Sequence, residues 1–385
     1  MTLYFEDVFR GVPVLITGHT GFKGSWLAIW LSALGAKVIG YSLPPPTQPS
    51  HFSVTNLMHK MIHVVGDIKN YDKLYDTIQE HQPVFIFHLA AQSLVLKSYA
   101  EPKETFDVNV LGTVNVLEAA RKSACVKGCL IATTDKCYEN REWIWGYRED
   151  DPLGGKDPYS SSKAMAELAA AAYRTAFFQN EDAKSVATGR AGNVIGGGDF
   201  SENRLVPDCI RALIRKEPIK VRNPQSVRPW IHVLDALSGY LCVAANLLRH
   251  GSQFAEAWNF GPLEQRGVSA EMLVEKAIAL WGQGDWVNTA APGQKLEMSQ
   301  LRLNWEKAAH TLQWRPVYDW ENALKETLSW FKSFQNFLEG EDHEKMYKVS
   351  LEHIHHYCAK ARESKLAWTE TEAKINNPLS TEQMV

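Results

Sequence analysis

A glycine-rich turn near the start of the chain constrains the possible folds more than any other feature. The turn, Gly18 to Gly24, has glycine at every third position and follows an apolar, β-branched run at Val12 to Thr17. A helical pattern with an apolar face follows at Ser25 to Leu34, and a second β-branched run at Lys37 to Tyr41. This order predicts a βαβ unit, whose two parallel strands are joined by a right-handed crossover.

The same alternation continues through the first half of the chain. Further strand candidates lie at Ile62 to Val65, Val84 to His88, Gly128 to Thr133 and Ser185 to Arg190. Helical patterns separate them at Tyr71 to His81, Val108 to Lys122 and Tyr159 to Phe178. We therefore predict an α/β fold, a Rossmann-type doubly wound parallel sheet.

Composition and charge exclude several classes of protein. The net charge of -3 comes from 41 basic and 44 acidic residues without a basic block, so we expect no nucleic-acid partner. The N-terminus lacks the apolar core of a signal peptide and no apolar run is long enough for a membrane, which predicts a cytoplasmic protein without membrane contact. The six cysteines have no framework spacing, which favours free thiols, and we predict no metal site.

The glycine turn also predicts a ligand. Glycines let the backbone approach a pyrophosphate, and the N-terminus of the next helix offers unpaired N–H groups. We expect dinucleotide contacts from Gly18, His19, Thr20, Gly21, Phe22, Lys23 and Gly24. An acidic residue usually ends the second strand, but Tyr41 and Ser42 stand there in this chain. NAD is still favoured over NADP, because no Arg or Lys near Ser42 could pair with a 2′-phosphate.

Tyr159 and Lys163 form the strongest catalytic candidate. A spacing of four places both on one face of a predicted helix, about one turn apart. A phenol with a reference pKa of about 10 is a poor base, but a nearby ammonium favours the phenolate. The pattern Tyr-x-x-x-Lys is weak by itself. Its place after a predicted strand that ends in Thr133, Thr134, Asp135 and Lys136 would bring a hydroxyl, the tyrosine and the lysine together beside the nicotinamide.

The chain divides into three predicted parts. Residues 1–192 form the NAD-binding Rossmann domain, which carries the catalytic residues. Residues 193–340 contain loops rich in Gly and Pro with short helices, and form mainly a smaller α/β substrate-binding region, parts of which can return to the sheet. Residues 341–385 are polar and are expected to form a C-terminal tail.

Five long segments make the chain similar to a known family. They are residues 17–26 (TGHTGFKGSW), 134–143 (TDKCYENREW), 157–163 (DPYSSSK), 190–199 (RAGNVIGGGD) and 228–233 (RPWIHV). Over about residues 10 to 335 the chain resembles the nucleotide-sugar 4,6-dehydratases of the extended short-chain dehydrogenase/reductase family, and among them the branch that acts on CDP-glucose.

This resemblance implies roles for further residues. Cofactor contacts are implied for Asp67, Ile68, Leu89, Ala90, Ala91, Gln92, Asn109 and Thr133, together with Tyr41, Ser42, Tyr159 and Lys163. Contacts with the sugar nucleotide are implied for Ser93, Thr134, Asn193 and Arg228. Arg228 is the best candidate for gripping the diphosphate, because its planar guanidinium can bind two oxygens at once. Asn109 is expected to act mainly by bonding backbone groups.

The resemblance also implies a reaction, the conversion of CDP-D-glucose to CDP-4-keto-6-deoxy-D-glucose and water. Tyr159 would be the base for oxidation at C4, with Thr134 bonding the sugar, and Asp135 would protonate the departing C6 hydroxyl. Related dehydratases typically have a glutamate as the C5 base where this chain has Lys136. Lys136 must be neutral to act as that base, and the alternative is a structural lysine with the base supplied elsewhere.

Other functions stay open at this stage. Another nucleotide-sugar dehydratase, acting on a dTDP-, UDP- or GDP-hexose, and a nucleotide-sugar 4-epimerase would share the cofactor site and Tyr159. A redox-sensing binding protein is disfavoured, because such sensors generally lack the Tyr/Lys pair. The resemblance further implies a homodimer or homotetramer and a pathway to dideoxysugars of a bacterial lipopolysaccharide O-antigen.

Overall fold

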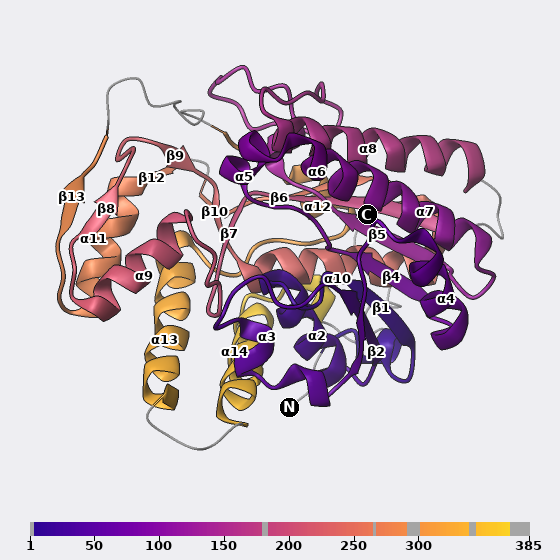
Figure 1. Cartoon of the computed structure of the whole chain (residues 1–385), viewed down its shortest axis with the longest axis horizontal. Coiled ribbons are helices and arrows are strands. Elements are labelled where there is room, and N and C mark those ends of the chain that lie inside the picture. The colour runs from indigo at the N-terminus through magenta and orange to yellow at the C-terminus, as the bar shows by residue number, and fades with distance from the viewer. Residues whose placement is uncertain (1–3, 179–183, 265–266, 291–300, 339–343, 370–385) are drawn as a thin grey trace, which may run out of the picture.

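A parallel sheet forms the centre of the molecule (Figure 1). The computed structural model describes residues 4–178, 184–264, 267–290, 301–338 and 344–369, and within them this sheet has seven strands. In spatial order they are β11 (Ala257–Phe260), β6 (Ser185–Ala191), β5 (Gly128–Ala132), β4 (Phe85–His88), β1 (Pro13–Thr17), β2 (Lys37–Ser42) and β3 (Ile62–Val65). All neighbouring pairs are parallel, which confirms the predicted doubly wound fold.

Helices cover both faces of this sheet (Figure 1). One face packs against α2 (Phe22–Ala33) and α10 (Val233–His250), and the other against α4 (Tyr71–His81), α7 (Gly112–Lys122) and α8 (Pro158–Phe177). Side chains alternate between the two cores along a strand, so Val14 and Ile16 lie in one core and Leu15 in the other. Because both faces are covered, the strands are apolar almost throughout.

The order of the strands reverses between β1 and β4, and this reversal positions the site. The chain moves outward from β1 to β2 and β3, and then returns to β4 on the opposite side of β1. Thr17, at the end of β1, pairs with Tyr41 of β2 and His88 of β4. The loops that follow β1 and β4 therefore leave the same edge of the sheet in different directions. Such a switch point is where doubly wound sheets bind ligands.

The second half of the chain adds a smaller region beside this edge. It contains the strand pairs β7 (Asn193–Ile195) with β10 (Trp230–His232), β8 (Ile219–Val221) with β13 (Trp286–Asn288) and β9 (Val227–Arg228) with β12 (Val268–Ser269), and the helices α9 (Leu205–Arg215), α11 (Ala270–Trp281), α12 (Glu306–Thr311) and α13 (Trp320–Leu338). Two of its later elements rejoin the first domain, since β11 pairs with β6 and α10 packs on the sheet.

Short helices connect the main elements. They are α1 (Glu6–Phe9), α3 (His51–Val54), α5 (Val95–Ala100), α6 (Pro102–Phe106) and a π-helical turn (Asp107–Leu111) that leads into α7, with 3₁₀ turns at Leu57–His59, Asp135–Cys137, Gly251–Phe254 and Ala367–Thr369. No helix in the described residues is long and apolar enough to cross a membrane.

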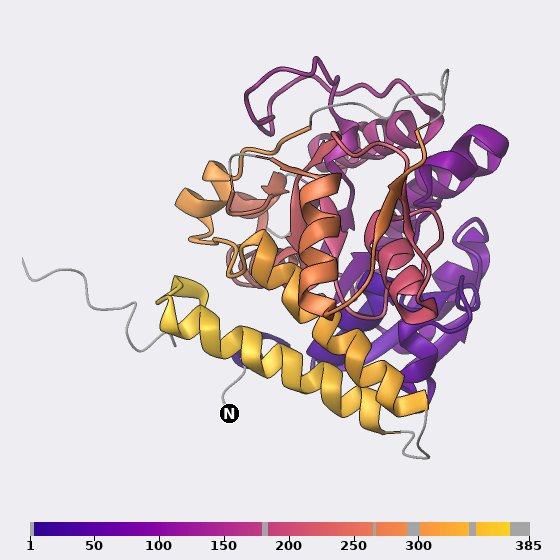
Figure 2. The ribbon, with the colours of Figure 1, turned by 90° about the vertical axis from the view of Figure 1, so that its left-hand side faces the viewer.

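The C-terminal part differs from the expected polar tail. Residues Lys345–Glu363 form helix α14, which runs beside α13 (Figure 2) and also packs on α2. Its buried side chains, Met346, Ser350, Ile354, Tyr357, Cys358 and Ala361, recur at helical spacing between the charged residues. The polar composition of this segment is compatible with an amphipathic helix, because only one face of such a helix has to be apolar. Residues 370–385 of the expected tail lie outside the described part of the chain.

Asp235 ties this C-terminal helix to the sheet domain. The carboxylate is fully buried at the start of α10 and accepts hydrogen bonds from the Val317 backbone N–H at 2.6 Å and the Tyr357 hydroxyl at 2.8 Å. Burial raises the pKa of this carboxyl from 3.8 to about 7. A group whose pKa is raised by folding stabilises the fold below its unfolded pKa, and this contribution is lost as the pH rises through about 7.

We therefore predict that Asp235→Asn weakens the pH dependence of stability. The thermal midpoint of the wild type relative to this variant should fall between pH 5 and pH 8, by an amount that corresponds to roughly 1 to 3 kcal/mol. Thermal unfolding at both pH values measures it, with the exposed Asp285→Asn as control. A constant difference between wild type and Asp235→Asn would contradict the prediction.

Candidate active site

The glycine turn brings two backbone segments into close contact at the switch point. Gly18 has a φ of 78°, and a Cβ there would lie 2.6 Å from the Ala90 nitrogen in the loop after β4. A Cβ on Gly24 would lie 2.2 Å from the Gly18 carbonyl oxygen. Helix α2 begins just beyond, with Gly21 at its N-cap and no side chain capping it. This narrow cradle of backbone and uncapped helix N–H groups fits a dinucleotide diphosphate.

Side chains below the turn fasten it to β2. His19 is fully buried and its Nε2 lies 2.6 Å from His63 Nδ1; burial, and then His63, lower its pKa to about 3, so it is neutral. The Thr20 hydroxyl bonds the Ser42 hydroxyl at 2.9 Å and donates to the Leu43 carbonyl at 2.9 Å. The side chains of His19 and Thr20 thus hold the turn in place, and backbone groups remain for the ligand.

A second wall follows β3. The Tyr41 hydroxyl donates to the Asp67 carbonyl at 2.9 Å, and the ring lies so close under Gly66 that a Cβ there would approach it to 2.3 Å. Ile68 likewise packs on Gly112, where an added Cβ would lie 2.8 Å from the Ile68 side chain. Tyr41 therefore supports the 66–68 segment from below. The Asp67 carboxylate accepts the Lys69 backbone N–H at 2.9 Å, and its segment starts beside Ser42, whose carbonyl accepts the Gly66 N–H at 2.8 Å.

The loop after β4 is held by two amide side chains that the sequence suggested as cofactor contacts. Asn109 accepts the Gln92 backbone N–H at 2.9 Å, and donates to the Gln92 carbonyl at 3.0 Å and the Ser162 hydroxyl at 2.9 Å. The Gln92 side chain bonds Leu94 and Thr105. Both amides are therefore used within the protein: Asn109 joins the loop that begins with Leu89, Ala90 and Ala91 to helix α8, and Gln92 joins it to α6.

Tyr159 and Lys163 lie in the first part of α8, one helical turn apart, as their spacing of four predicts. Asp157 caps this helix by accepting the Ser160 N–H at 2.9 Å, which sets the first turn. Burial raises the pKa of Tyr159 to about 12, against the opposing effects of the Thr134 hydroxyl and Arg204. Burial lowers the pKa of Lys163 to about 8, and its ammonium donates to the Ala132 carbonyl at 3.2 Å.

The segment after β5 places an acid and a base candidate beside this pair. Thr134 begins the 3₁₀ turn and donates from its hydroxyl to Asp135 Oδ1 at 2.9 Å. Asp135 is fully buried, and its second oxygen, Oδ2, has no hydrogen-bond partner among the described residues. Lys136 Nζ lies 3.6 Å from Asp135 Oδ1 and 3.3 Å from Asn193 Oδ1. Thr133 differs from its neighbours, because its hydroxyl is turned inward to Glu167.

The site contains two cations that the sequence analysis did not place there. Arg204 was not predicted at all, and Lys23 was predicted only as a cofactor contact. Arg204, just before α9, bonds Asp199 Oδ2 and the Ser93 hydroxyl at 3.1 Å each, and so joins the loops after β7 and β4. The Lys23 side chain also reaches inward, and burial followed by Lys163 and Arg204 lowers its pKa to about 7. No local pattern marks Arg204, because its neighbours in the site come from distant segments.

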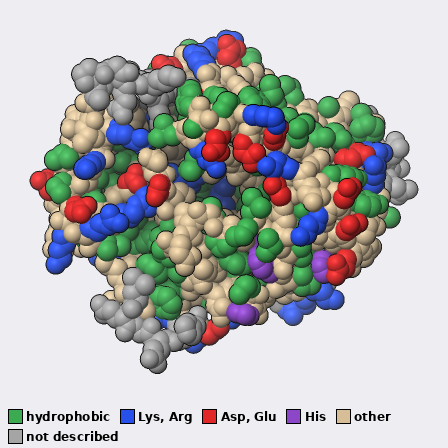
Figure 3. Space-filling view, viewed as in Figure 1, with side chains coloured by type: hydrophobic (Ala, Val, Ile, Leu, Met, Phe, Trp, Pro, Cys, Tyr) green, Lys and Arg blue, Asp and Glu red, His purple; other side chains and the backbone are tan. Residues whose placement is uncertain are grey.

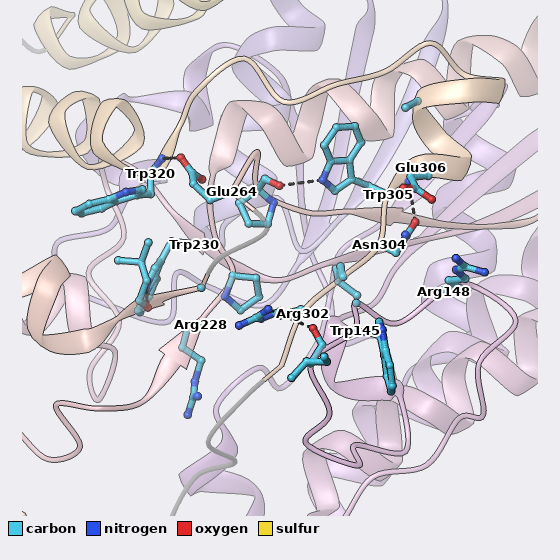
Figure 4. A pocket seen from close by; sticks show the side chains of 18 of the residues that line it. Trp145, Arg148, Arg228, Trp230, Glu264, Arg302, Asn304, Trp305, Glu306 and Trp320 are labelled. Atoms are coloured by element: carbon cyan, nitrogen blue, oxygen red, sulfur yellow. Dashed lines mark hydrogen bonds between the residues drawn. The ribbon is translucent and has the colours of Figure 1, made fainter.

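A cavity of about 700 Å³ lies next to Arg228. Figure 4 shows Trp230 and Trp320 on one side and Trp145, Trp305 and Arg148 on the other, with Arg302 between them. The cavity adjoins the segment of Asp135 and Lys136. Pro229, which lines the cavity, accepts the Asn193 N–H at 3.1 Å, and the Asn193 side chain bonds Lys136. The space-filling view shows a hollow near the middle of one face, with Lys or Arg side chains deep inside it (Figure 3).

A doubly wound sheet with this glycine turn and a Tyr/Lys pair beside Thr134 defines the class of short-chain dehydrogenase/reductase enzymes. The family model described as GDP-mannose 4,6 dehydratase matches residues 15–327, and the chain belongs to that family. Over 342 residues it is 44% identical to the CDP-glucose 4,6-dehydratase of Salmonella typhimurium, covering 88% of this chain and 94% of the relative. It is 26% identical to a dTDP-glucose 4,6-dehydratase of Xanthomonas campestris pv. campestris, covering 85% and 95%.

Solved structures agree on the fold. The dTDP-glucose 4,6-dehydratase of Bacillus anthracis, in complex with NAD, has a TM-score of 0.71 at 25% identity, over 85% of this chain and 98% of that one. The UDP-glucose 4-epimerase of Thermotoga maritima has a TM-score of 0.72 at 23% identity, over 84% and 100%. Dehydratases and epimerases thus share this architecture, and the fold does not distinguish between them.

Proposed function

We propose that the chain is a 4,6-dehydratase that converts CDP-glucose to CDP-4-keto-6-deoxyglucose and water with bound NAD. One observation supports the dehydratase assignment: the fully buried Asp135 carboxylate, one oxygen of which has no partner in the described part of the chain, lies beside Thr134 in a site that also contains Tyr159 and Lys163. The relative at 44% identity supports CDP-glucose as the substrate.

The cradle at the switch point suits NAD. The uncapped N–H groups at the start of α2 would hold its diphosphate, and Ser42 and Asp67 border the space for its adenosine half. Bound NAD supplies the hydride acceptor for oxidation at C4 of the sugar and the hydride donor for reduction at C6.

The residues of this chain handle the protons. Tyr159 takes the proton of the C4 hydroxyl as C4 is oxidised, and the Lys163 ammonium stabilises the phenolate form of this tyrosine. The Thr134 hydroxyl hydrogen-bonds the C4 oxygen of the sugar. The resulting 4-ketone acidifies the proton on C5. Removal of that proton by a base and protonation of the C6 hydroxyl by Asp135 release water and leave a double bond between C5 and C6. Addition of hydride at C6 and return of the proton from the base to C5 then complete the 4-keto-6-deoxy product.

Lys136 is the proposed C5 base, and its neighbour makes this arrangement workable. An ammonium cannot take up a proton, and a carboxylate cannot give one up. Transfer of a single proton from Lys136 to Asp135, whose charged atoms lie 3.6 Å apart, would produce the neutral amine and the carboxylic acid that the elimination needs.

The nucleotide half would extend from Arg228 into the adjoining cavity. Arg228 would grip the diphosphate, with Ser93 and Asn193 nearer the sugar. Several tryptophan faces line the cavity beyond, with Trp145 at 66% exposure available for stacking on a base.

The substrate assignment is tested by incubating the purified protein and NAD with CDP-, dTDP-, UDP- and GDP-hexoses. We expect a 4-keto-6-deoxy product from CDP-glucose, and with a C4-deuterated substrate we expect the label at C6. Tyr159→Phe should lower turnover about 10²- to 10⁴-fold, because the base for C4 oxidation is gone. No product from CDP-glucose would overturn the assignment, and conversion to a C4 epimer without loss of water would favour the epimerase.

A second experiment tests Lys136. In Lys136→Ala we expect C4 oxidation to persist while water loss and exchange of the C5 proton with solvent collapse, by about 10²-fold or more. Deuterium incorporation at C5 in heavy water measures the exchange, and the exposed Lys220→Ala is the control for the lost charge. Normal exchange in Lys136→Ala would remove Lys136 from the base role.

We also propose that the chain forms a homodimer through α8. Met165, Leu168, Ala172 and Ala176 are exposed at helical spacing along this helix, and the first two have exposures of 46% and 59%. Such an apolar strip is typical of a helix that packs against another copy. A homotetramer would pair two such dimers. The cytoplasmic location and the dideoxysugar pathway stay predictions of the sequence.

Sedimentation equilibrium of Leu168→Glu tests the dimer. A buried charge at the helix contact should turn a wild-type dimer into a monomer. Met58→Glu, which changes an equally exposed apolar residue elsewhere, should leave the mass unchanged. A dimeric Leu168→Glu would contradict the use of α8.

A further inference from the structure

We propose that Glu167 is a positioning residue of the active site, which neutralises Arg190 and thereby leaves the charge of Lys163 available to the Tyr159 phenolate. The inference deepens the proposed function, because it concerns how the base of that reaction is activated.

Glu167 occupies a fixed place behind the catalytic pair. It lies on α8, one helical turn beyond Lys163, and only 3% of it is exposed. Its Oε2 accepts Arg190 Nη2 at 2.8 Å and the Thr188 hydroxyl at 2.7 Å, while Oε1 accepts the Thr133 hydroxyl. Both oxygens are therefore engaged by side chains of β6 and of the segment that follows β5.

Arg190 is buried as deeply as Glu167, with 3% exposed. Its second guanidinium nitrogen, Nη1, donates to the Tyr138 hydroxyl at 2.7 Å and the Glu149 carbonyl at 2.9 Å. These partners satisfy hydrogen bonds, and the direct ion pair is with Glu167. A buried guanidinium that lacked its carboxylate would be costly, so the two charges depend on each other.

Counting charge over these buried groups gives the functional consequence. Lys163 and Arg190 are positive and Glu167 is negative, so one positive charge is left over, and it belongs to the residue one turn from Tyr159. Glu167 also acts on Lys163 directly, opposing the burial that lowers the pKa of this ammonium to about 8. Without the Glu167 charge the pKa of Lys163 would fall further and its proton would be lost closer to neutral pH.

Other charged groups face the same pair from every surrounding element. Asp135, Lys136 and Cys137 follow β5, Arg204 precedes α9, Lys23 lies on α2 and Asp157 begins α8. Tyr240 of α10 faces Tyr159 and Glu167, and His88 of β4 faces Lys163. All of these remain in the variants below, so differences between the variants report on Glu167 and Arg190.

The pH dependence of turnover distinguishes an electrostatic role of Glu167 from a merely structural one. Turnover needs the Lys163 ammonium, so it falls as the pH rises through the pKa of Lys163. We expect Glu167→Gln to move this basic limb about one pH unit lower, and Arg190→Gln to move it about one unit higher. The double variant should return the limb to the wild-type position, because the pair is then removed as a neutral unit.

Thr188→Val is the structural control. It removes one hydrogen bond to Glu167 and no charge, so the limb should stay in place even if stability falls. Shifts in the same direction for Glu167→Gln and Arg190→Gln, or a double variant no nearer to wild type than Glu167→Gln, would overturn the inference. Should one single variant fail to fold, the shift of the other single variant, and its reversal in the double variant, still decides it.

A second readout does not depend on the substrate. The titration of the Lys163 ammonium, followed by NMR of ¹³C-labelled lysine side chains and assigned with Lys163→Arg, should lie at lower pH in Glu167→Gln than in wild type, since the compensating negative charge is gone. An unchanged titration would count against Glu167. If the wild type converts no CDP-glucose, the proposed function fails, but this titration still tests the inference.

Discussion

The close contact between the Gly18 turn and the Ala90 loop is the constraint on which the rest of the structure depends. It exists because the strand order reverses between β1 and β4, so their two loops leave one edge of the sheet in different directions. A Cβ at Gly18 or Gly24 would fill the space with carbon where backbone N–H groups must stay accessible. The elements around this point hold it rigid, through Thr20 on one side and Asn109 on the other.

The half of the site around Tyr159 is built on a shared set of buried and half-buried charges. Lys23, Lys163 and Arg204 are gathered around Tyr159 and Asp135, which makes the site electropositive and suited to the anionic diphosphate of a nucleotide sugar. Their surroundings disfavour the charged form of both lysines. Burial and repulsion between the cations lower the pKa of Lys23 to about 7, and burial lowers the pKa of Lys163 to about 8. The buried Glu167–Arg190 pair lies directly behind them and connects the helix of Tyr159 with the strands that lead to Thr134 and Asn193.

Sequence patterns predicted those elements whose structure depends on neighbouring residues in the chain. The helix with Tyr159 and Lys163, the strand before Thr134 and the turn at Gly18 were all predicted, since each depends on residues close in sequence. The C-terminal helix α14 was missed, because its apolar face is made by widely spaced residues within a polar composition. The inward turn of Thr133 and the internal bonds of the Gln92 side chain were not visible either, since the partners Glu167 and Thr105 come from other elements.

The sequence by itself determined the class of fold, the place of the dinucleotide turn and the candidates for the central proton-transfer residues. Hydrophobic periodicity, the residues of a turn and a spacing of four on a helix are properties of short segments, and they do not depend on where those segments lie in the fold. Only the tertiary structure decided that Arg204 bridges Ser93 and Asp199, that Lys136 faces Asp135 and Asn193, and that Glu167 is engaged by Arg190. These are contacts between segments far apart in the chain, and a charge acquires its role only when folding fixes its neighbours and removes the surrounding water.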